Sequence, residues 1–174
     1  MGARSTFVSW KIQCVDICEI HISISSEVSI MSKKDMLREQ LEKEGNLHLF
    51  EETDDGFEGD ISVHSYDEAF HVFLDVEEDS AYNTITIRLG TMPREKLSDA
   101  LLLLNQFNSY NPNGAYFTLD PDEPDDPYIV FFRCTYTALA DAFDADIYTS
   151  ILAAIINDIE NEDEYKQLMQ LRWK

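Results

Sequence analysis

The chain has 174 residues, 34 of them acidic and 13 basic, which gives a formal net charge of −21 at pH 7. This length suits one ordinary domain, and a hydrophobic share of 44% supplies enough apolar surface for a folded core. A charge of this sign repels phosphate groups, so we expect no binding to nucleic acids or to anionic membranes. It favours solubility and attracts basic partners.

The cysteines Cys14, Cys18 and Cys134 have neither the spacing of a disulfide framework nor that of a zinc site. Free thiols in a reducing compartment fit this pattern best. No apolar stretch reaches the roughly 18 residues that a membrane-spanning helix needs. Charged residues also interrupt the N-terminal region where a signal peptide would have its apolar core. The sequence therefore predicts a cytoplasmic protein.

Residues 1–30 differ in composition from the rest of the chain. Their charged residues are Arg4, Lys11, Asp16, Glu19 and Glu27. The run 20–25 alternates between apolar and polar side chains, which is typical of a strand. We predict a single domain over residues 31–174, preceded by an N-terminal appendage at 1–30. The alternative is that residues 1–30 add an edge strand to the main sheet.

A helix is predicted to begin at Ser32, because Asp35 follows it at the spacing of a capping box. Gly45 can end this helix by adopting a left-handed conformation. Strands are expected next, where apolar and polar side chains alternate. The alternating segments are 47–50, 61–64, 70–75 and 84–89. This alternation indicates an antiparallel sheet with one buried face.

Pro93 suits a first helical turn, and residues 94–110 form a predicted helix with an apolar centre. A strand is expected at 115–120 and another at 128–134, followed by a helix over 146–160. The predicted fold is therefore α+β, in the order α-β-β-β-α-β-β-α. Helices 94–110 and 146–160 are expected to cover one face of the sheet.

Signatures of catalysis are missing from the sequence. It has no glycine-rich phosphate loop and no nucleophile-elbow motif. His64 and His71 are expected on the solvent side of the sheet, and the acidic loop 122–126 lacks the ligand order of a calcium-binding EF-hand. We predict no catalytic residue, no metal site and no cofactor, and hence a protein that is not an enzyme.

The stretch from Leu104 to Asn108, followed by a Pro/Gly turn and an aromatic strand at 115–120, resembles the YbjN family of bacterial sensory-transduction regulators. The domain of that family is similar to class I type III secretion chaperones. The resemblance covers about residues 32–160. It implies a compact α+β domain that is often dimeric and acts through protein contacts. Asn105 and Asn108 are the positions matching the family motif, and we expect them to fix the helix end and the following turn.

These observations favour a non-catalytic protein-binding module, regulatory or chaperone-like, whose partner the sequence does not identify. The alternative is an acidic decoy or immunity-type inhibitor that occupies a basic cleft of a nuclease or DNA-binding protein. The strand 128–136 carries apolar side chains on both faces, and the helices can cover only one of them. We therefore expect a homodimer, with Tyr128, Val130 and Phe132 as a candidate partner-binding apolar surface.

Overall fold

The computed structural model describes residues 31–110, 115–121 and 127–171. The chain divides into two units, residues 1–30 and Met31–Lys174, and all of the described residues belong to the second unit. The predicted strand at 20–25 and the role expected for residues 1–30 lie outside the described residues, as do Cys14 and Cys18. Cys134 is a free, buried thiol.

Helix α1 spans Lys33–Lys43 and begins as the sequence predicts. The Ser32 side chain accepts a hydrogen bond from the Asp35 backbone N–H at 3.0 Å, which satisfies one of the free amides of the first turn. Gly45 follows the helix with a φ of +76°, a conformation that favours glycine. A 3-10 turn, η1 (Leu47–Leu49), then leads into the sheet.

The sheet has six antiparallel strands in the spatial order β1-β2-β3-β4-β6-β5. Their bounds are β1 Phe50–Glu52, β2 Gly56–Val63, β3 Glu68–Asp75, β4 Tyr82–Met92, β5 Tyr116–Pro121 and β6 Tyr128–Thr137. Gly59 on β2 lies against β1 so closely that a Cβ there would stand 2.0 Å from the Leu49 carbonyl oxygen. Glycine at this position is therefore what lets the short edge strand β1 approach β2.

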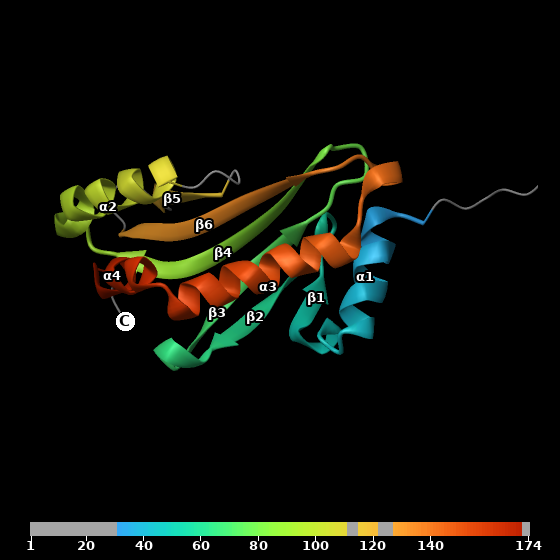
Figure 1. Cartoon of the computed structure of the whole chain (residues 1–174), viewed down its shortest axis with the longest axis horizontal. Coiled ribbons are helices and arrows are strands. Elements are labelled where there is room, and N and C mark those ends of the chain that lie inside the picture. Colours follow the sequence, from blue (N-terminus) through green and yellow to red (C-terminus); the bar gives the residue numbers. More distant parts are fainter. Residues whose placement is uncertain (1–30, 111–114, 122–126, 172–174) are drawn as a thin grey trace, which may run out of the picture. The chain divides into compact units, whose positions relative to one another are not determined.

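The remaining helical elements are η2 His64–Tyr66, η3 Arg94–Lys96, α2 Leu97–Tyr110, η4 Ala140–Ala142, α3 Ala145–Asn161 and α4 Asp163–Leu171. Asp144 caps α3 by accepting hydrogen bonds from the backbone N–H groups of Asp146 and Ile147. Glu162 has extended backbone angles, so it separates α3 from α4. Figure 1 shows α3 lying across the sheet, with α1 near one end of α3 and α4 near the other.

Burial alternates along the strands, as the sequence predicts. On β3, Phe70, Val72 and Leu74 are buried, while His71 and Phe73 between them are only half-buried. The buried set joins side chains of the helices in one core. The side chains on the opposite face of the sheet are mostly half-buried or exposed, and in the described part of the chain this face lies outside the core.

The predicted α+β fold with an antiparallel sheet is confirmed, and two details differ. Four strands precede α2, one for each of the four alternating segments and one more than the predicted order α-β-β-β-α-β-β-α contains. Residues 47–49 form a 3-10 turn, so the first strand, β1, begins only at Phe50. The C-terminal helical region is two helices in place of one. The described residues contain no helix that is both long enough and apolar enough to cross a bilayer.

Candidate functional site

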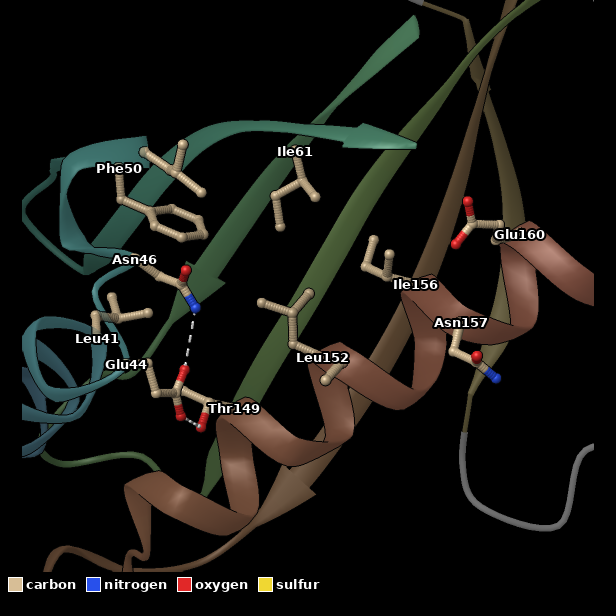
Figure 2. A pocket seen from close by; sticks show the side chains of 12 residues that line it. Leu41, Glu44, Asn46, Phe50, Ile61, Thr149, Leu152, Ile156, Asn157 and Glu160 are labelled. Carbon is tan, nitrogen blue, oxygen red and sulfur yellow. Dashed lines mark hydrogen bonds between the residues drawn. The ribbon is translucent and has the colours of Figure 1, made fainter. Parts of the chain in front are cut away.

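An apolar groove of about 350 Å³ lies between α3, the connection from α1 to β1, and strand β2. Figure 2 shows side chains from β1 and β2 on one side of it and side chains from α3 on the other, pointing toward one another. The apolar residues that line it are Leu41, Leu49, Phe50, Ile61, Leu152 and Ile156. Its volume and apolar lining are those of a ligand-binding site.

The face of α3 that lines the groove follows from helical spacing. Its lining residues are Thr149, Leu152, Ala153, Ile156, Asn157 and Glu160. These positions recur every three or four residues, so they form one stripe along the helix. Ile155 and Ile159, on a neighbouring stripe, are buried in the core. The apolar surface of α3 is thus wider than the part that packs into the core, and the remaining part lines the groove.

Tyr148 fixes the start of α3 against the sheet. Its side chain is fully buried, and its hydroxyl donates a hydrogen bond to the Thr84 carbonyl oxygen at 2.7 Å. Burial raises the pKa of this phenol well above its ordinary value, so the hydroxyl stays protonated and remains a donor. This contact sets the position of the α3 wall relative to the strands.

Carboxylates stand toward both ends of the groove. Glu44 accepts hydrogen bonds from the Thr149 hydroxyl at 2.7 Å and from the Asn46 side-chain amide at 3.3 Å (Figure 2). Glu160 lies toward the other end (Figure 2). None of the lining residues is basic. The site therefore combines an apolar wall with negative ends.

Chemically, the arrangement is suited to binding. The lining is mostly apolar, and it contains no histidine, cysteine or lysine. The Glu44 carboxylate already accepts hydrogen bonds, and the Glu160 carboxylate lies toward the other end of the groove. The groove can take up apolar side chains on its wall and cations at its ends.

Sequence reasoning did not find this groove. No single segment carries a motif for it, because the wall comes from two regions, 41–61 and 149–160, that are far apart in the chain. The one available signal was the width of the apolar stripe on α3, where Leu152 and Ile156 extend it beyond Ile155 and Ile159.

The candidate surface formed by Tyr128, Val130 and Phe132 needs correction. Val130 is 1% exposed and Phe132 is 2% exposed, so both belong to the core. The Phe132 ring lies 5.0 Å from that of Phe117 on β5 and 6.1 Å from that of Tyr165 on α4. Tyr128 is half-buried beneath the Arg94 guanidinium. The even-numbered side chains of β6 face the helices. Because successive side chains of a strand alternate, Phe131 and Arg133 lie on the opposite face.

Asn108 and Asn105, the two positions of the family motif, have different surroundings. The Asn108 side chain accepts a hydrogen bond from the Phe117 backbone N–H at 2.8 Å and donates one to the Phe117 carbonyl at 3.2 Å. These backbone groups lie on the edge of β5 that does not pair with β6. The amide thus occupies part of a free sheet edge, where an unpaired strand invites aggregation. Asn105 is exposed.

We expect Asn108→Ala to lower the free energy of unfolding by about 1–2 kcal/mol, because two backbone groups lose their partner. Asn105→Ala on the same helix is the matched control and should change it by less than about 0.5 kcal/mol. Urea denaturation of both variants measures the difference. Equal effects of the two substitutions would contradict the role given to Asn108.

Comparisons with known proteins extend this description. No family model matches the chain, and no curated protein matches it. Among solved structures, the chain is similar to the crystal structure of YbjN from E. coli, described as a candidate transcription regulator. The identity is 10% and the TM-score is 0.58, over 80% of this chain and 95% of that chain. This likeness supports a YbjN-like fold, while membership of the YbjN sequence family stays a prediction.

Proposed function

We propose that this protein is a non-catalytic protein-binding module, regulatory or chaperone-like, whose groove receives a short amphipathic helix of a partner protein. The observation that carries the proposal is the apolar wall of the groove between Glu44 and Glu160. The likeness in fold to a candidate regulator supports a regulatory role. The expected location is the cytoplasm, and we expect neither nucleic acid nor membrane as a partner.

The dimensions of the groove define its ligand. Residues 149–160 of α3 span about 16 Å at the helical rise of 1.5 Å per residue. A partner helix of about three turns matches that length and would place apolar anchors at positions i, i+3 or i+4, and i+7. A lysine or arginine at each end would face Glu44 and Glu160. Such cations would also be drawn toward a protein with a net charge of −21.

The acidic-decoy alternative makes a different demand on the molecule. A decoy would bind a basic cleft through exposed carboxylates, with no need for an apolar wall. A larger side chain that fills the groove would leave such binding intact. The same change would abolish binding of an amphipathic helix. Substitutions at two neighbouring alanines on α3 distinguish the two functions.

Ala153 lines the groove, and Ala154, the next residue, does not. Both side chains are exposed, so a larger side chain at either position leaves the core intact. We expect Ala153→Phe to fill the groove and to weaken binding of a selected peptide at least tenfold. Ala154→Phe should leave the affinity within about twofold. The probe is a 16-residue peptide selected by the full-length protein from a displayed random library, and calorimetry measures its affinity.

The selected peptides themselves provide a second readout. Enrichment of apolar residues at helical spacing, flanked by Lys or Arg, is the expected result. Peptides that are basic throughout and bind both variants equally would favour the acidic decoy and contradict the groove.

A further inference from the structure

The two carboxylates at the ends of the groove differ in how many of their acceptor sites are occupied. Glu44 follows the last turn of α1 at one end, and Glu160 lies toward the other end (Figure 2). An ionised carboxylate has two oxygens and about four acceptor sites. The proposed partner helix carries a cation at each end, so the acceptor sites that remain free determine which cation each carboxylate can bind.

The Glu44 carboxylate is largely occupied by donors of its own chain. Its Oε1 accepts one hydrogen bond from the Thr149 hydroxyl and one from the Gln40 side-chain amide, each at 2.7 Å. Both donor side chains are buried. Its Oε2 accepts a longer hydrogen bond from the Asn46 side-chain amide, at 3.3 Å. The acceptor sites of Oε1 are therefore filled, and Oε2 has one site left.

Gln40 holds this carboxylate from behind the groove, because it is not one of the lining residues. Its Nε2 also donates a hydrogen bond to Asp146 Oδ1 at 3.0 Å, so both hydrogens of the amide are used. Asp146 does not line the groove either. Gln40 thus joins α1 to the start of α3 and keeps Oε1 of Glu44 turned toward α3. It is a positioning residue for Glu44.

The Glu160 carboxylate has different surroundings. Its residue lies in the last turn of α3, where the helix carries a partial negative charge that attracts cations. The Glu160 backbone carbonyl accepts a hydrogen bond from the Ser65 hydroxyl at 3.2 Å. In the part of the chain that the structure describes, no side chain donates a hydrogen bond to the carboxylate itself, and nearby Lys166 pairs with Asp163. Glu160 can therefore offer an acceptor site on each oxygen.

Lysine and arginine need different acceptors. An arginine guanidinium binds a carboxylate through two parallel N–H···O bonds, one to each oxygen, whereas a lysine ammonium is a compact charge. Glu160 has both oxygens available for the two bonds of an arginine. At Glu44 only Oε2 can accept, so an arginine would leave half of its donors without an acceptor in the groove. A lysine needs only the one acceptor that Glu44 still offers.

We propose that the Glu44 end of the groove binds a lysine of the partner helix and that the Glu160 end binds an arginine of the same helix. This inference rests on the proposed function and deepens it, because it assigns one cation to each end. A helix with two different cations would fit the groove in one direction only. The difference between Glu44 and Glu160 therefore also determines the direction of the bound helix.

Calorimetry of the full-length protein with variants of the selected peptide tests this assignment. The residue at each end of the peptide is set to Lys, Arg or Gln, and each peptide is measured against the wild-type protein, Glu44→Gln and Glu160→Gln. The cation that faces Glu44 is the one whose contribution to affinity disappears in Glu44→Gln. At that position lysine should bind about threefold more tightly than arginine, and at the position facing Glu160 arginine should bind about threefold more tightly than lysine.

Thr149→Val provides a second readout, since it removes one donor of Oε1 at nearly constant volume. With an acceptor site free on each oxygen, the Glu44 end should lose its preference for lysine, and the preference at the Glu160 end should stay unchanged. The matched control is Thr149→Ser, which keeps the hydroxyl and should keep the preference for lysine. Circular dichroism verifies that each variant is folded.

The outcomes separate this inference from the proposed function. If the peptide binds in the groove and both ends prefer the same cation, or if the Glu44 end prefers arginine, the assignment is overturned and the proposed function stands. Cations that couple to neither carboxylate would overturn the assignment as well. A peptide that binds Ala153→Phe as tightly as the wild-type protein would overturn both.

Discussion

Lys33→Met should lower the free energy of unfolding by about 3 kcal/mol, since it leaves several buried oxygens without a donor. The Lys33 side chain is 0% exposed. Its Nζ donates to the Glu77 carbonyl at 2.8 Å, to the Ser80 carbonyl, and to Asn83 Oδ1 at 3.1 Å. This ammonium group joins the first turn of α1 to the loop between β3 and β4.

Asn83 extends the same network and is also 0% exposed. Its amide donates to the carbonyls of Tyr136 at 2.9 Å and Ala138 at 3.0 Å, which fixes the end of β6. Lys33 and Asn83 are therefore energetically coupled. In a double-mutant cycle, Lys33→Met combined with Asn83→Ala should cost less than the sum of the two single changes.

The neighbouring lysine supplies the control. Lys34 is partly exposed; it pairs with Glu52 at 3.1 Å and donates to the carbonyls of Thr53 at 3.1 Å and Asp54 at 3.3 Å. Because exposed ion pairs contribute little, Lys34→Met should cost about 1 kcal/mol or less. Chemical denaturation followed by circular dichroism compares the variants. Equal losses for Lys33→Met and Lys34→Met would contradict the importance of the buried network.

Phe132→Ala should lower the free energy of unfolding by about 3–5 kcal/mol, the usual cost of removing a buried aromatic ring. The ring contacts Phe117, which in turn lies 5.3 Å from Phe107 on α2 and 5.6 Å from Tyr165 on α4. Its loss would open a cavity where β5, β6 and both helices meet. The adjacent Phe131 lies on the face of the sheet opposite the helices and is half-buried.

Phe131→Ala is the matched control for the assignment of faces on β6. This substitution should cost about 1–2 kcal/mol, because a half-buried ring loses less contact. Thermal unfolding of the two variants compares the two substitutions. A larger loss for Phe131→Ala than for Phe132→Ala would mean that the helices cover the other face of β6.

Much of the fold follows from local patterns in the sequence. Alternation along β3 and β4 predicts both the sheet and its buried face, and Ser32 with Asp35 predicts the start of α1. The strand β6 is different, because Ile129 and Phe131 alternate with Val130 and Phe132, and both sets are apolar. Hydrophobicity alone assigns neither set to the core, which is why the candidate surface was placed on the wrong face.

The remaining features depend on contacts between distant parts of the chain. A lysine in the first turn of a helix is normally exposed, and burial of Lys33 becomes favourable through its acceptors in the β3–β4 loop and on Asn83. The groove forms because Phe50 and Ile61, on two strands, lie opposite the side chains of α3. The periodicity of a single segment cannot predict such a contact between distant segments.

The most direct test of the central claim, that the groove binds an amphipathic helix, is an NMR titration of the isotopically labelled full-length protein with the selected peptide. We predict that shifted amides cluster at residues 149–160 of α3, at η1, and at β1. Glu44→Gln and Glu160→Gln should each weaken binding, and salt should weaken it further, because cations of the peptide face these carboxylates. Shifts confined to α2 or to the face of the sheet opposite the helices, with residues 149–160 unchanged, would contradict the claim.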